Sequence, residues 1–124
     1  MTLIPDADKE EEFALALMKR LPATVRVGAH DFHILLLGPN AVIAEGKNGL
    51  FSSSCQTIEI GTTLPTRYAV VDVVLHELAH AIFWTGGLED KDDEERTVER
   101  FGGGLTGLFR DNPWLLDWIK SAEL

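Results

Sequence analysis

The stretch LPTRYAVVDVVLHELAHAIFWTGG, residues 64–87, decides how this chain folds. Its long apolar run starts after Leu64-Pro65 and stops at Gly86-Gly87, which predicts one helix over roughly residues 66–84. His76 and His80 are four residues apart, so both imidazoles project from the same face of this helix. The apolar flanks predict that the helix is largely buried, and buried histidines need polar partners.

The five residues HELAH, 76–80, are typical of a zinc site. Neutral imidazole suits Zn²⁺, and a site with three protein ligands keeps a fourth position open for water. Glu77 lies about 100° round the helix from His76, where its carboxylate can act as general base toward that water. Histidine pairs at this spacing also occur in helices that bind no metal. The motif nevertheless predicts one Zn²⁺ per chain, bound by His76 and His80, with Glu77 as the catalytic residue.

Length and composition limit the classes of protein that this chain can be. Its 124 residues, 45% hydrophobic and 25% charged, predict a single soluble domain over residues 1–124. A net charge of −9 argues against nucleic acid or an anionic membrane as the main partner and leaves a protein or peptide. Cys55 is the single cysteine, so no intrachain disulfide can form. Because no signal pattern or membrane-length apolar run is present, we expect a cytoplasmic location.

The rest of the chain predicts an α+β fold with a small twisted antiparallel or mixed sheet. We expect a first helix over 6–21, strands at 24–27, 32–37, 50–54 and 57–60, and a loop over 41–49. A second long helix should be capped by Asp92 or Asp93. Its inner stripe is expected at Val98, Phe101, Leu105, Leu108 and Phe109. The glycines at 102–104 either break this helix or allow close approach to the histidine helix, and we favour close approach. Asn112 should cap a last helix, with Pro113 at its first position.

A third zinc ligand must come from outside the HELAH motif. Glu95 is the main candidate because its three-residue spacing to Val98 puts it on the expected inner stripe. Glu99 follows one turn later and could hydrogen-bond a ligating imidazole. The competing interpretation is a capping box, with Asp92 as N-cap and Glu95 three residues on, and no metal contact. Further candidates are His30 and His33 upstream and the other acidic residues near Glu95: Asp90, Asp92, Asp93 and Glu94.

His76-Glu77-x-x-His80, followed by Glu95-x-x-Val98-Glu99-x-Phe101, resembles the small gluzincin metallopeptidases of bacteria and phages, with the ImmA/IrrE-like group nearest. The resemblance covers roughly residues 57–110. It implies a minimal zincin-like fold, in which a small sheet precedes the HExxH helix and a glutamate-bearing helix, and Glu95 as the third ligand. It also implies an edge strand that pairs with extended peptide substrate, for which residues 50–54 are the candidate. Val98 and Glu99 depart from the small residue and the Asn or Asp that the family carries at these positions.

These observations predict a zinc-dependent metallopeptidase, more specifically an endopeptidase, in which His76, His80 and Glu95 bind the ion and Glu77 is the general base. The alternatives are a zinc-stabilised interaction module, whose closed site would take Cys55 as a fourth ligand, and an inactive peptidase homologue. The presence of Glu77 argues against the inactive homologue. Candidate donors to the oxyanion are Tyr68, His30, His33 and Arg100, and the sequence does not choose among them.

Overall fold

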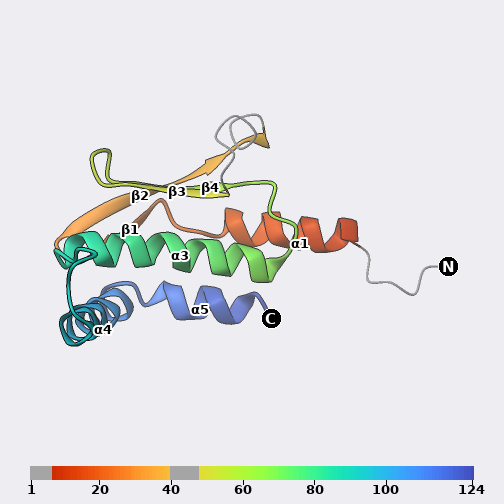
Figure 1. Cartoon of the computed structure of the whole chain (residues 1–124). Helices are drawn as coiled ribbons and strands as arrows, with labels where there is room; N and C mark the ends of the chain where they lie inside the picture. Colours follow the sequence, from red (N-terminus) through yellow and green to blue (C-terminus); the bar gives the residue numbers. More distant parts are fainter. Residues whose placement is uncertain (1–6, 40–47) are drawn as a thin grey trace.

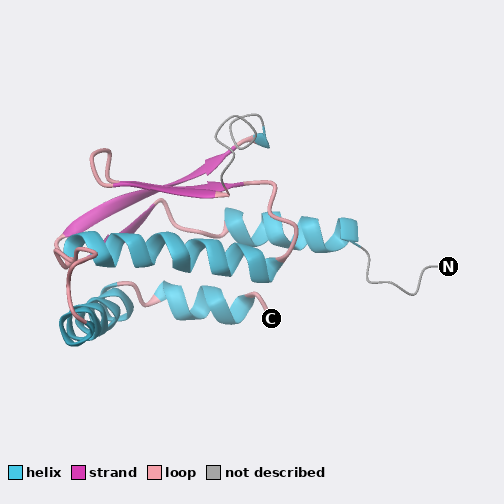
Figure 2. Ribbon diagram, in the orientation of Figure 1, coloured by secondary structure: helices cyan, strands magenta, loops and turns pink. Residues whose placement is uncertain are grey.

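The structure is a computed structural model that describes residues 7–39 and 48–124. The predicted α+β class is confirmed, with four helices and a four-stranded mixed sheet in those ranges (Figures 1 and 2). The strands are β1 (Thr24–Val27), β2 (His30–Leu37), β3 (Gly49–Ser52) and β4 (Thr57–Gly61). The helices are α1 (Ala7–Lys19), α3 (Arg67–Thr85), α4 (Glu94–Asp111) and α5 (Trp114–Ser121). Of the loop expected over 41–49, residues 41–47 lie outside the described ranges, and Gly49 begins β3.

The sheet has the strand order β1-β2-β4-β3. β1 and β2, which overlap the strands expected at 24–27 and 32–37, form an antiparallel hairpin with Val27 paired to His30. β2 then pairs with β4 in parallel, and β3 pairs with β4 in the antiparallel direction. Within the described residues β3 is therefore an edge strand, as the resemblance implied for residues 50–54.

α3 lies at the centre of the molecule. Figure 1 shows the sheet on one side of α3, α1 beside it, and α4 and α5 on the side away from the sheet. The buried apolar residues of α3 belong to a single hydrophobic core that also contains side chains from the sheet and the other helices. The largest fully buried side chains include Phe32, Leu17, Met18, Ile58, Ile60, Leu78 and Ile82. In α5, Trp118 is buried in this core and Trp114 packs against it. None of the helices in the described ranges combines the length and apolar character needed to cross a membrane.

The inner stripe expected on α4 is wrong in part. Leu108 is buried and Phe101 packs against the core, but Val98 is 61% exposed, and Leu105 and Phe109 are also exposed. The helix runs unbroken through the glycines at 102–104, and a Cβ at Gly104 would overlap the Ile82 side chain of α3. The predicted close approach is therefore confirmed at this glycine. α4 packs against α3 with the side that carries Gly104. Val98 lies on another side of α4 and therefore faces outward.

Asn112 does not cap α5, contrary to expectation. It ends α4, and its buried side chain joins that helix to β1. Its Oδ1 accepts a hydrogen bond from Arg26 N at 2.9 Å, while Nδ2 donates to Arg26 O at 2.6 Å and to Leu108 O at 2.8 Å. Asn112 is therefore a tertiary link between the last helices and the sheet.

Candidate functional site

The helix that carries the HELAH motif has well-defined ends. Thr66 is the N-cap, and its Oγ1 accepts a hydrogen bond from Ala69 N at 3.1 Å. At the other end Gly86 N donates to Ile82 O at 2.9 Å, and Gly87 takes a φ of +65°, which suits glycine. These caps place α3 within one residue of its predicted bounds and fix the histidine pair in the middle of a rigid helix.

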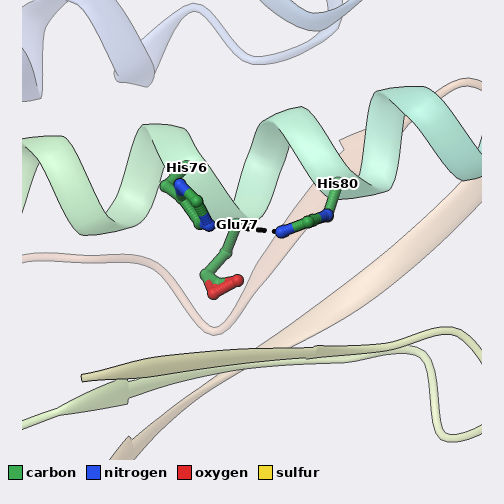
Figure 3. A group of neighbouring side chains, drawn as sticks. All are labelled: His76, Glu77 and His80. Atoms are coloured by element: carbon green, nitrogen blue, oxygen red, sulfur yellow. Dashed lines mark hydrogen bonds between the residues drawn. The ribbon is translucent and has the colours of Figure 1, made fainter. Parts of the chain in front are cut away.

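The two histidines of the motif meet as their spacing predicts. Their Nε2 atoms lie 3.2 Å apart, and the ring planes are 77° apart (Figure 3). Two imidazole nitrogens bound to one tetrahedral Zn²⁺ at 2.0–2.1 Å would lie about 3.3 Å apart. His76 and His80 therefore already have the separation that a shared ion requires. The same distance also permits a hydrogen bond between the two rings.

The expectation that the histidines are buried is wrong. His76 and His80 are exposed, whereas Glu77 between them is only 4% exposed. The reason is that α3 packs on the sheet and on the other helices with its remaining sides and leaves one face open. Figure 3 shows the Glu77 side chain pointing from α3 toward the strands below it. The motif thus presents two accessible nitrogens beside a shielded carboxylate.

His76, Glu77 and His80 form a group whose potential ligand atoms lie within 4.8 Å of one another. They line a cleft of about 490 Å³ between α3 and β3. Asp72, one turn before His76, lies on the same face of α3 and also lines this cleft. The remaining lining residues are Asn48, Gly49, Leu50, Phe51 and Val73. The sequence analysis did not single out Gly49, Phe51 or Asp72 as site residues, although the four-residue spacing could have identified Asp72.

An aromatic cluster closes the cleft beside His80. Phe51 of β3 stacks on the His80 ring, and it also contacts Phe32 with ring centroids 5.5 Å apart. Trp84, one turn after His80, lies 6.4 Å from Phe51 and 5.0 Å from His30, again between ring centroids. The edge strand and the histidine helix are therefore joined by ring contacts at one of the candidate ligands.

Glu95 is not part of the histidine group in this structure. Glu95 is exposed in the first turn of α4. Its expected inward direction depended on Val98 facing the core, and Val98 faces outward. The argument from the inner stripe is therefore wrong, as is the competing capping box. The N-cap is Asp93, whose Oδ1 accepts from Arg96 N at 2.8 Å, and Asp92 forms an ion pair with Arg96 instead. The role of Glu95 as third ligand stays a prediction, and so does that of Glu99, which is also exposed.

The four candidate oxyanion donors lie outside the lining of the cleft. Tyr68 is 68% exposed near the start of α3, and Arg100 Nη1 donates to Gly86 O at 3.0 Å. His30 Nδ1 lies 3.0 Å from Gln56 Nε2, with its ring against Trp84, and His33 is exposed on β2. Cys55, the alternative fourth ligand, is exposed between β3 and β4 and lies outside the histidine group.

No family model matches the sequence, and neither a curated protein nor a solved structure matches the chain.

Proposed function

We propose that this protein is a zinc-dependent metallopeptidase with a minimal zincin-like fold, in which His76, His80 and Glu95 bind one Zn²⁺ and Glu77 is the general base. The observation that carries the proposal is the 3.2 Å separation of the His76 and His80 Nε2 atoms, with the Glu77 carboxylate in the same group. Two histidines four residues apart on one helix, with a glutamate next to the first, are the ligand pair and the general base that HExxH zinc hydrolases use. Zn²⁺ supplies a water of lowered pKa and polarises a scissile carbonyl.

Glu77 is suited to proton transfer because it is shielded from bulk water yet borders the cleft. Its carboxylate would accept the proton of the attacking water and pass it to the leaving amine. His76 and His80, whose rings are accessible from the cleft, would hold the ion through Nε2. The third ligand has to come from another element, and Glu95 is the carboxylate that the resemblance to gluzincins indicates.

The edge strand β3 supports a peptide as the substrate. β3 pairs with β4 along one side only within the described residues, and three of its residues, Gly49, Leu50 and Phe51, line the cleft. An extended peptide can add to such an edge through main-chain hydrogen bonds, which would carry its carbonyls past the histidines. Among the described residues, the lining of the cleft contains Asp72 and Glu77 and no Lys or Arg, which favours basic peptides over acidic ones.

The experiment is cleavage of a diverse peptide library by the zinc-loaded full chain, with products identified by mass spectrometry. We expect cleavage by the parent and by Glu12→Gln, an exposed glutamate on α1, and none by Glu77→Gln. Equal cleavage by Glu77→Gln would show that a contaminant is responsible. A parent that binds zinc but cleaves nothing would favour the zinc-stabilised interaction module.

A further inference from the structure

At Gly49 the edge strand lies against the Glu77 side chain. A Cβ added at Gly49 would lie 3.0 Å from Glu77 Oε2, 3.1 Å from Glu77 Cγ and 2.8 Å from Val73 Cγ1. Real Cβ atoms essentially never approach a carbon as closely as 2.8 Å, so a side chain at position 49 must displace something. Gly38, at the end of β2, is a useful contrast because its Cβ would have no atom within 4 Å.

Three groups could move to accommodate a side chain at position 49: the strand, Val73 or Glu77. The strand is held by its pairing with β4, where Gly49 is paired with Ile60, and by a 2.7 Å hydrogen bond from Gly61 N to Asn48 O. Val73 is β-branched and has one strongly preferred rotamer on a helix. The 2.8 Å contact is with Val73, so Val73 or the strand must shift, and the Glu77 carboxylate, at the end of a side chain with three rotatable bonds, must give way as well.

We infer that Gly49 is a positioning residue for Glu77: the missing side chain at position 49 leaves the space that the Glu77 carboxylate occupies. The catalytic part of this inference rests on the proposed function. A base displaced by about 1 Å from its proton loses much of its effect on the rate, whereas the atoms nearest the added Cβ belong to Val73 and Glu77 and not to His76 or His80. Gly49→Ala should therefore separate hydrolysis from zinc binding.

The contact itself can be tested without zinc and without a substrate. Urea unfolding of Gly49→Ala is measured in the parent background and in the Glu77→Ala background, as a double-mutant cycle. We expect a clear fall in the unfolding midpoint in the parent background and a smaller fall where Glu77 has been shortened. Gly38→Ala is the matched control and should lower the midpoint in neither background. Equal falls for Gly49→Ala in both backgrounds would overturn the inference.

If Gly49→Ala does not yield folded protein, the same cycle is run in a Val73→Ala background. That change removes the contact of 2.8 Å and leaves the contacts with Glu77. The expected result is again a smaller fall when Glu77 is shortened, and equal falls again contradict the inference.

The activity of the zinc-loaded chain supplies the second readout. Gly49→Ala should lower kcat by about a hundredfold while KM and zinc affinity stay near those of the parent. Loss of zinc affinity in proportion to kcat would overturn the positioning role. A parent without peptidase activity, combined with coupling in the unfolding cycle, would refute the proposed function but leave the contact between Gly49 and Glu77 established.

Discussion

Phe51 and His80 lie ring against ring, with ring planes only 10° apart and centroids 6.4 Å apart. Phe51 belongs to the edge strand and His80 to α3, so this offset stack joins the two walls of the cleft at a candidate zinc ligand. We expect this stack to favour one orientation of the His80 imidazole before any ion binds.

Replacing Phe51 should therefore affect both stability and metal binding. We expect Phe51→Ala to destabilise the fold by about 2 kcal/mol, less than the 3–5 kcal/mol of a fully buried ring, because Phe51 is half-buried. Zinc affinity should fall by about tenfold, since the freed imidazole must be ordered on binding. Phe51→Tyr keeps the ring and should retain both properties. Calorimetric zinc titration of the two variants measures the effect, and equal affinities would show that the stack does not orient His80.

Glu77→Gln should separate metal binding from hydrolysis. The amide keeps the shape of the side chain but cannot accept the proton, so we expect hydrolysis to fall by about 10²–10⁴-fold with zinc affinity retained. His76→Ala should lose both properties because it removes a ligand. Parallel zinc titration and peptide cleavage assays measure these outcomes. Loss of zinc by folded Glu77→Gln would mean that Glu77 is a ligand and not a base.

The role of Glu95 can be decided by a comparison with its neighbour Glu94, which is also exposed in the first turn of α4. If Glu95 is the third ligand, Glu95→Ala should weaken zinc binding by more than about a hundredfold, and Glu94→Ala should leave it nearly intact. Because Asp93 caps α4, Glu95→Gln should leave the stability of the zinc-free protein close to that of the parent. Parental affinity in all three variants would assign the carboxylate to another residue, such as Asp93 or Glu99.

Glu10 gives the fold a predictable dependence on pH. Its carboxylate accepts hydrogen bonds of 3.0 Å from the Arg67 side chain and from Arg67 N, which ties α1 to the first turn of α3. The Arg67 side chain, and after it the backbone N–H, holds the pKa of Glu10 below its ordinary value. A lowered pKa in the folded state means stabilisation that is present above the ordinary glutamate pKa and is lost as the pH falls through the lowered value.

Glu10→Gln should therefore lower the urea midpoint at neutral pH, and its difference from the parent should shrink in acid. Glu11→Gln, an exposed neighbour on the same helix, is the control and should change little at any pH. Urea unfolding at several pH values between neutrality and the acid limit of the fold makes the comparison. A difference between Glu10→Gln and the parent that does not vary with pH would contradict this interpretation.

The sequence predicted the elements whose signals are local. Leu64-Pro65 and Gly86-Gly87 predicted the ends of α3 to within one residue, and the four-residue spacing of His76 and His80 was sufficient to predict that they meet. The strands expected at 24–27 and 32–37 are present as β1 and β2. Each of these features depends on residues a few positions apart.

The features that were missed depend on contacts between distant segments. Periodicity identified an apolar stripe on α4 but not the side that α3 covers, so Val98 was expected inside and is exposed. The direction assigned to Glu95 was wrong for the same reason. Likewise, no local pattern indicated that Gly49 lies against Glu77, because that contact depends on the position of β3 beside α3.

The zinc content of the purified full chain tests the central claim most directly. Elemental analysis should be made on protein prepared without chelator or nickel resin, together with Glu77→Gln and His76→Ala. We predict one zinc per chain in the parent and in Glu77→Gln, and a strongly reduced content in His76→Ala, because His76 Nε2 and His80 Nε2 bind the same ion. Less than about a tenth of an equivalent in the parent, even after zinc is added back, would contradict the proposed metal site and the function built on it.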